Sequence, residues 1–283
     1  MHLSHIEEYD DQGGKTKKRD RLSGVGSSTS VLAPSVAGAV QATEIKVLAS
    51  NAVKEAFKNL IPAFEKASGQ KVTVVFASST EIVNQISGGE SVDLVVTAAS
   101  VTDALIKQGK LLAGSKVDFS KSGIGVAIRP GAPKPDISSG DALKASLLAA
   151  KSILLSTGPS SGHLIDLFQQ MGIADALKPK LKQLALGMPV GPALANGEGE
   201  LGFTQICEFL PVKGIVYLGP LPADIQHITV FSMGLHASAT AADAARSLMK
   251  FLSSPEAIPA IRNSGMEPAL RPRPTGRGHT YPK

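Results

Sequence analysis

The chain contains no tryptophan, 3 tyrosines and only 4% aromatic residues. This scarcity argues against a sugar-stacking cleft or an aromatic cage for a quaternary amine, because both need several exposed rings. A single cysteine, Cys207, excludes an internal disulfide and a cysteine-rich metal site, and we expect it to be a small buried apolar residue. Neither a phosphate-binding loop nor a dinucleotide fingerprint is present, so we expect no cofactor. No His/Asp/Glu cluster has the spacing of metal ligands, so we expect no metal.

The formal net charge of +5 is concentrated at the C-terminus. Residues 271–283 carry 4 basic and no acidic side chains, whereas residues 43–270 carry 20 basic and 19 acidic ones. Because the last residues are rich in proline and glycine, we expect 271–283 to be a disordered tail. No basic helix with interleaved aromatic residues remains to follow a phosphate backbone, which argues against nucleic acid as a partner.

Residues 1–42 have the order of an export signal. A basic segment at 15–21 precedes a mildly apolar stretch at 22–42, which ends in small residues with Ala42 last. Serines dilute the apolar stretch, so a disordered leader is the alternative interpretation. Cleavage would leave Thr43 as the mature N-terminus of a periplasmic protein. Nothing else approaches a membrane-spanning length, so we expect a protein that is not membrane-embedded.

From Ile45 onward, short β-branched runs alternate with stretches of helical periodicity. The order is strand, helix, strand, helix, strand, helix. It predicts strands at 45–49, 71–76 and 93–98, and helices at 52–68, 79–87 and 101–108. Such an alternation is typical of a parallel sheet with helices on both faces.

A glycine-bearing strand at 122–129 interrupts this rhythm, and a similar strand at 228–235 follows later. Between them we expect helices at 140–150, 162–172, 174–182 and 190–196, and strands at 152–155, 201–206 and 215–218. Two helices, at 241–253 and 255–263, complete the pattern. Two α/β units joined by two extended strands predict a two-lobed fold, in which 43–125 and 232–270 form lobe 1. Residues 126–231 form lobe 2.

Small polar residues follow several of these strands, at the positions where the next helix begins. Open parallel sheets bind ligands beyond the carboxyl ends of their strands. Backbone N–H groups at helix N-termini, joined by hydroxyls, suit an oxyanion or a carboxylate, although ordinary capping is the alternative for any one residue. The candidate ligand-binding residues are Ser50, Asn51, Ser78 and Ser79 on one wall, and Thr157, Ser160, Ser161, His163 and Gln205 on the other.

Several segments resemble the periplasmic molybdate-binding proteins of ABC transporters, namely 76–80 (FASST), 92–96 (VDLVV) and 200–205 (ELGFTQ). The resemblance covers roughly 44–268. It implies a type 2 periplasmic-binding-protein fold, with two parallel-rich sheets joined by two hinge strands. It also implies a small anionic ligand held by hydroxyls and amides, an ABC transporter permease as partner, and a monomer. Ser79 matches a ligand serine of the family, whereas the other ligand serine falls at Ala52 and the ligand tyrosine at Gln205.

Further segments resemble a divergent branch of that family that is similar to aconitate isomerase. They are 122–127 (SGIGVA), 216–222 (VYLGPLP) and 265–268 (GMEP). An isomerase of a tricarboxylate needs a general base and fixed cations, for which His163 and Arg129 are the candidates. A solvated surface position is the alternative for Arg129. We therefore expect a solute-binding protein for a molybdate-like oxyanion or a small organic acid, with a tricarboxylate isomerase as the alternative.

Overall fold

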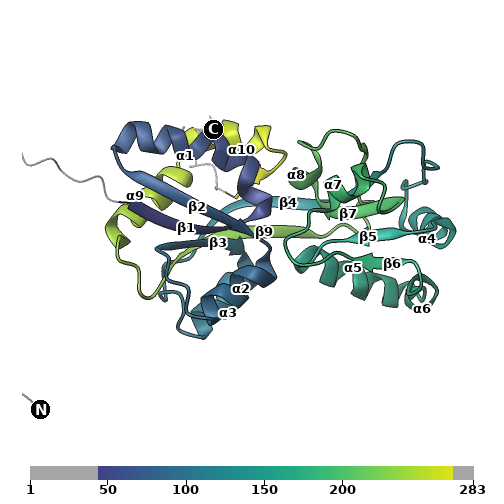
Figure 1. The fold of residues 1–283 in the computed structure, drawn as a ribbon, viewed down its shortest axis with the longest axis horizontal. Coiled ribbons are helices and arrows are strands. Elements are labelled where there is room, and N and C mark those ends of the chain that lie inside the picture. The colour runs from purple at the N-terminus through teal and green to yellow at the C-terminus, as the bar shows by residue number, and fades with distance from the viewer. Residues whose placement is uncertain (1–43, 270–283) are drawn as a thin grey trace, which may run out of the picture. The chain divides into compact units, whose positions relative to one another are not determined.

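The computed structural model describes residues 44–269 (Figure 1). The predicted export signal at 1–42 and the predicted tail at 271–283 lie outside these residues. Within them, no helix has both the length and the apolar character needed to cross a membrane.

The first sheet has the predicted alternation of strands and helices. Its parallel strands are β1 (Glu44–Ser50), β2 (Lys71–Ala77) and β3 (Leu94–Ala98), in the spatial order β2-β1-β3. The helices that follow them are η1 (Asn51–Val53) with α1 (Lys54–Ser68), α2 (Ser79–Ser87) and α3 (Ala99–Lys107). Gly69 ends α1 with φ 70°, a left-handed conformation that glycine adopts without steric cost.

Both faces of this sheet are covered. On one face, α1 packs with α9 (Ala242–Leu252), η2 (Pro255–Ala257) and α10 (Ile258–Asn263). On the other face, α2 and α3 pack against β1 and β3 (Figure 1). The core beneath α1 includes an edge-to-face pair of Phe57 and Phe119, with ring centroids 5.7 Å apart. Every residue of β3 is buried, as expected for a strand between two helical layers.

Two long strands, β4 (Val117–Ile128) and β9 (Ile228–Leu235), run antiparallel to each other. β9 also pairs with β3, and the short β10 (Glu267–Pro268) pairs with the first part of β4. The second part of β4 pairs with strands of another sheet, so the backbone pairing continues through β4 from one sheet to the next. The predicted lobe boundaries, 125/126 and 231/232, fall within β4 and β9 and stay a prediction.

The second sheet contains β5 (Ile153–Leu155), β6 (Leu181–Gln183) and β7 (Leu201–Gln205), which are parallel, and β8 (Val216–Pro220), which is antiparallel to β4. Its helices are α4 (Gly140–Ala149), α5 (Pro159–Gln170), α6 (Ala174–Leu177), α7 (Val190–Ala195) and α8 (Ile206–Phe209). This sheet has its own apolar core, which includes Leu143, Ile153, Phe168 and Phe203. The two-lobed α/β fold class is confirmed. We call the first sheet with its helices lobe 1, and the second sheet with its helices lobe 2.

Three predicted elements differ from the structure by three residues or more at one end. The helix predicted at 174–182 is wrong in its second half, because α6 ends at Leu177 and 181–183 form β6. The strand predicted at 122–129 begins earlier, at Val117. Its first residues include polar side chains that break the apolar pattern, such as Asp118, which accepts a hydrogen bond of 2.7 Å from Ser232. Helix α5 begins at Pro159 rather than at 162.

Candidate functional site

A cavity of about 300 Å³ is lined by segments of both lobes that follow the carboxyl ends of parallel strands. β1 leads to Ser50 and β2 to Ser78 on the lobe 1 side. β5 leads to Thr157 and β7 ends in Gln205 on the lobe 2 side. Of the predicted ligand-binding residues, those that line the cavity are Ser50, Asn51, Ser78, Ser79, Thr157, Ser160 and Gln205.

The three lobe 1 serines each accept a hydrogen bond from within the protein. Ser50 Oγ accepts from the backbone N–H of Ala52 at 3.4 Å, and Ser78 Oγ accepts from the N–H of Glu81 at 3.2 Å. Ser79 Oγ accepts from the hydroxyl of Thr97 at 3.2 Å. A serine hydroxyl is one donor as well as an acceptor. None of the three hydroxyls donates to another described residue, so each hydroxyl proton is available to a ligand in the cavity.

The lobe 2 side of the cavity is formed by the N-terminus of α5. Gly158 precedes this helix with φ 153°, which a residue with a Cβ rarely adopts, and it offers no side chain to cap the helix. Pro159 is the first helical residue. Thr157 and Ser160 therefore lie at a helix N-terminus, where the helix dipole favours negative charge. Pro159 has no N–H, and the N–H groups of Ser161 and Gly162 donate to the Gly158 oxygen, so Ser160 supplies the N–H of this first turn that a ligand can use.

Two predicted residues of α5 do not line the cavity. The hydroxyl of Ser161 donates to the backbone oxygen of Ser156, so it holds the turn before α5 together. His163 lies further along the helix and stacks on His227, with ring centroids 4.5 Å apart. Its Nε2 lies 3.5 Å from the backbone oxygen of Ile225. Burial lowers the pKa of His227, and the neighbouring His163 lowers it further.

Arg129 is also absent from the cavity lining. Its backbone N–H donates to Glu200, just before the start of β7, whereas Gln205 at the other end of β7 pairs with Ile124. Five residues of extended strand separate Ile124 from Arg129, a distance of roughly 16 Å. The structure therefore does not bring Arg129 to the carboxyl ends of the strands as a carboxylate clamp.

Three charged residues line the cavity that the sequence did not single out: Lys54, Glu55 and Glu208. Lys54 begins α1, and its Nζ lies 5.9 Å from the centre of the Phe76 ring. Glu55 forms an ion pair of 2.6 Å with Lys58 on the next turn of α1. Glu208 belongs to the short helix α8, directly after β7. Only its position two residues after the end of the predicted strand 201–206 could have suggested it.

The Glu208 carboxyl is held in place by its own chain. The Thr204 hydroxyl donates to Glu208 Oε2, and the backbone N–H of Gln205 also bonds the carboxyl. Burial raises the pKa of Glu208, and these two hydrogen bonds oppose that change. Burial raises the pKa of the neighbouring Cys207 thiol to about 12, with a further contribution from the charge of Glu208. Cys207 is therefore a buried thiol rather than a thiolate nucleophile, as predicted.

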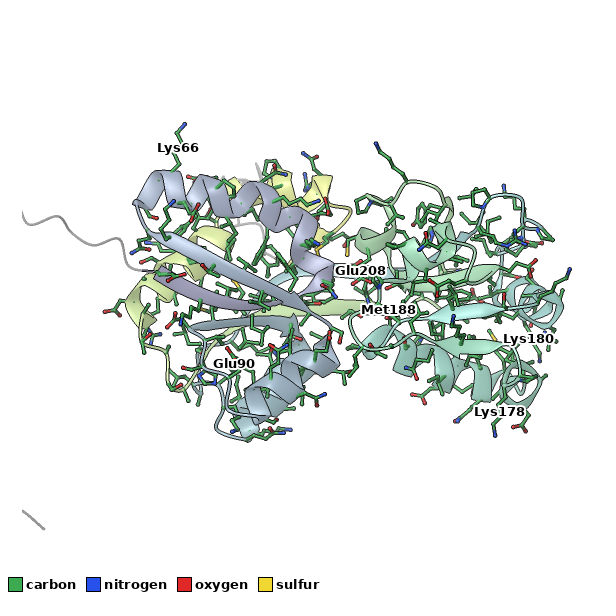
Figure 2. The ribbon with its side chains drawn as sticks, in the orientation of Figure 1. Lys66, Glu90, Lys178, Lys180, Met188 and Glu208 are labelled. Carbon is green, nitrogen blue, oxygen red and sulfur yellow. The ribbon has the colours of Figure 1, made fainter. Side chains whose placement is uncertain are left out.

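The segment 184–189 of lobe 2 also reaches the cavity. Met188 lines it although 44% of its surface is exposed, and Gly187 lies against lobe 1. A Cβ at Gly187 would be only 2.9 Å from Glu81 Oε1. Figure 2 shows Met188 and Glu208 where the elements of the two sheets meet. The cavity is thus bounded by both lobes.

The family model for bacterial extracellular solute-binding proteins matches residues 45–267. Among characterised proteins, an aconitate isomerase from a Pseudomonas species is 35% identical over 232 residues, which are 80% of this chain and 88% of that protein. The molybdate-binding protein ModA of Azotobacter vinelandii is 26% identical over 176 residues, which are 61% of this chain and 69% of that protein.

Solved structures have the same fold. The periplasmic molybdate-binding protein of Azotobacter vinelandii matches with a TM-score of 0.64 and 19% identity, covering 81% of this chain and all of that one. The sulfate-binding protein SubI of Mycobacterium tuberculosis matches with a TM-score of 0.66 and 18% identity, covering 80% of this chain and 87% of that one. At this level of identity the likeness shows a periplasmic-binding-protein fold.

Proposed function

The chain belongs to the bacterial extracellular solute-binding protein family, and from this premise we propose that it binds a small organic anion in the cavity between its lobes. The observation that carries the proposal is the hydrogen bonding of the Ser50, Ser78 and Ser79 hydroxyls, each of which accepts within the protein and keeps its proton to donate to a ligand. Three donors on one wall are joined by the N-terminus of α5 on the other, which no side chain caps. Such a site is complementary to an anion without needing a full counter-charge.

The size of the cavity supports an organic acid rather than a single tetrahedral ion. About 300 Å³ is at the lower end of the volumes of small-molecule sites and exceeds what four oxygens around one atom need. Lys54 adds a flexible positive charge at the cavity, which suits a ligand with more than one carboxylate. Molybdate and sulfate, which the related proteins are named for, remain the comparison ligands.

The wider role that we propose follows from the family. A solute-binding protein of this type acts outside the cytoplasmic membrane, in the periplasm, and delivers its ligand to an ABC transporter permease. The family match and the likeness to molybdate-binding proteins support this role. Export would require the segment at 1–42, which stays a predicted signal, and sequencing the N-terminus of the protein from its native host tests whether it begins at Thr43.

A thermal-shift screen tests ligand binding directly. The panel contains molybdate, tungstate, sulfate, citrate, tricarballylate, cis-aconitate and trans-aconitate at equal ionic strength. A ligand that binds only the folded protein, at 100 times its Kd, adds about 2.7 kcal/mol to the free energy of unfolding. We expect a carboxylate to give the largest shift. A response to molybdate and tungstate alone would contradict the organic-acid assignment.

We expect a Ser79→Ala substitution to weaken binding of the anion found in that screen by about 5- to 150-fold. It removes one donor at the cavity, and a buried hydrogen bond to an anion contributes about 1–3 kcal/mol. Thr97→Val is the matched control, because it removes the same Thr97–Ser79 hydrogen bond but keeps the Ser79 hydroxyl. Calorimetric titration should show a loss of affinity for Ser79→Ala only. Equal losses in both variants would mean that this pair serves folding rather than binding.

A second candidate function is the isomerisation of a tricarboxylate, supported by the 35% identity to a protein named aconitate isomerase. The same cavity would hold the substrate, and Glu208 supplies a carboxyl within it. Incubating the protein with cis-aconitate or trans-aconitate and separating the isomers by chromatography tests this function. Interconversion would establish an enzyme, whereas binding without interconversion would favour a receptor.

A further inference from the structure

Glu208 is an acidic residue in a cavity whose other features favour an anion. Its side chain is half-buried and lines the cavity beside Gln205. The Thr204 hydroxyl and the Gln205 backbone N–H fix the orientation of the carboxyl, so it is not a mobile surface group. An ionised carboxylate at this place would repel an anionic ligand and weaken its binding. A carboxylate here is therefore unfavourable in a site that only binds anions.

The other groups that face Glu208 do not neutralise it. From α1, Glu55 is paired with Lys58 at 2.6 Å, and Lys54 is exposed and lies near the Phe76 ring. On α8 itself, the Cys207 thiol has a pKa of about 12 and stays protonated. Described residues form no ion pair with Glu208, so its carboxyl can gain or lose a proton without breaking a salt bridge.

We propose that Glu208 is a catalytic acid–base residue that moves a proton on the carbon skeleton of the bound anion, an unsaturated di- or tricarboxylate. This inference rests on the proposed anion site. The Glu208 carboxylate takes a proton from a methylene carbon that lies between a carboxylate and a carbon–carbon double bond. The electron pair of the broken C–H bond enters the conjugated system, and its negative charge spreads onto carboxylate oxygens.

The lobe 1 serines of the cavity can stabilise that charge. Ser50, Ser78 and Ser79 line the cavity, and none of their hydroxyls donates to another described residue, so they can donate to carboxylate oxygens and stabilise the additional negative charge as it develops. Glu208 then returns the proton. Return to the same carbon restores the substrate, whereas return to the former vinyl carbon moves the double bond by one position. No atom or electron is gained or lost, so the reaction needs no cofactor.

Burial of Glu208 suits this role. It raises the pKa of the carboxyl, which brings the group closer to the pH at which a base is both ionised and able to accept a proton. We therefore expect the rate of proton transfer to rise with pH through the pKa of Glu208 and then to level off. A residue that only capped α8 would give no such profile.

Exchange of carbon-bound hydrogen in D₂O is the direct test. The full-length protein is incubated with cis-aconitate or trans-aconitate, and proton NMR follows the loss of the methylene signal. We expect exchange with the native protein and a rate at least about 100-fold lower with Glu208→Gln, the usual contribution of a general base. Affinity for the same ligand should not fall in this variant, because the neutral amide removes a negative charge that opposes an anionic ligand.

Two further variants test whether a loss of exchange comes from the Glu208 carboxyl itself. Glu198→Gln makes the same change outside the cavity, in the Lys182–Glu198 ion pair, and should leave exchange unchanged. Glu208→Asp keeps the carboxyl but withdraws it by one methylene, and should retain part of the rate.

The stability of the Glu208→Gln variant follows from the pKa of the native carboxyl. A carboxyl with a raised pKa stabilises the fold at low pH and loses that contribution as pH rises through this pKa. The Glu208→Gln variant, whose amide is neutral, should thus fold at pH 7 at least as well as the native protein.

The outcomes separate this inference from the proposed function. If no organic acid binds, the proposed function itself fails. If aconitate binds to the native protein without exchange or isomerisation, the anion site stands and the role of Glu208 is overturned. Exchange that persists at the native rate in Glu208→Gln would equally overturn it, because another group would then be the base.

Discussion

A Ser78→Asp substitution is expected to weaken anion binding by at least about 100-fold while the fold stays intact. The new side chain replaces a hydroxyl donor of the cavity with a carboxylate. Loss of the donor costs about 1–3 kcal/mol, and a like charge in contact with the ligand costs several kcal/mol more. Together they exceed the roughly 2.7 kcal/mol that corresponds to 100-fold.

The fold should tolerate this change because Ser78 is the N-cap of α2. Its Oγ accepts from the Glu81 N–H at 3.2 Å, and an aspartate carboxylate can do the same. Aspartate is as good an N-cap as serine, and its charge is favourable at a helix N-terminus. Circular dichroism and urea unfolding should therefore resemble those of the native protein.

Ser139→Asp provides the matched control. Ser139 is the N-cap of α4, where its Oγ accepts from the Ala142 N–H at 3.1 Å, and it does not line the cavity. Calorimetry should show native affinity for Ser139→Asp. If Ser78→Asp bound the same anion with less than a tenfold loss, the anion would have to lie away from the N-terminus of α2, and the proposed site would be wrong.

Much of the fold could be predicted because its strands and helices are amphipathic or fully apolar. Helix α2 occupies the predicted residues, since Ser78 caps its start and Gly88 follows its end. Strand β9 also has the predicted bounds, as β-branched and apolar residues fill it. Strand β6 escaped prediction because it lies at the edge of its sheet, where backbone pairing with β5 suffices and an apolar pattern is not needed.

The residues that line the candidate site could be predicted where they lie at the carboxyl ends of strands. Ser50, Ser78 and Gln205 line the cavity because each lies at or just after the carboxyl end of a parallel strand. His163 does not, because α5 begins at Pro159 and His163 lies beyond its first turn. A helix turns by 100° per residue, so an error of three residues in its start redirects every side chain that follows.

Glu208 illustrates a limit of a different kind. Whether a carboxyl three residues beyond a strand faces solvent or a cavity depends on the turn that follows the strand. Here a single turn of helix, α8, folds the side chain back toward Thr204 and Gln205. Arg129 is the opposite case, because the register of β4 on β7 places it away from the strand ends. Neither the turn nor the register has a signature in the local sequence.

Asp93 holds together two parts of lobe 1 that are distant in sequence. Its side chain is only 2% exposed. Oδ2 accepts from the backbone N–H of Lys46 in β1 at 2.8 Å, and Oδ1 accepts from the N–H groups of Thr240 and Ala241, also at 2.8 Å. Ala241 is the N-cap of α9 and cannot cap the helix with its own side chain. Asp93 therefore acts as the capping residue of α9 from a different segment of the chain.

We expect Asp93→Ala to lower the free energy of unfolding by about 3 kcal/mol or more, because it leaves three backbone N–H groups without an acceptor at about 1–3 kcal/mol each. Urea unfolding measures this loss, and the melting temperature should fall by at least about 6 °C. Asp103→Ala, which removes an exposed ion pair with Lys116, should lower the free energy of unfolding by no more than about 1 kcal/mol.

Anion binding should not depend on Asp93. This residue precedes β3, at the opposite end of the sheet from the cavity, so the Asp93→Ala variant should keep the native anion affinity under conditions in which it is folded. Equal stability losses in the two variants would show that these hydrogen bonds do not anchor α9.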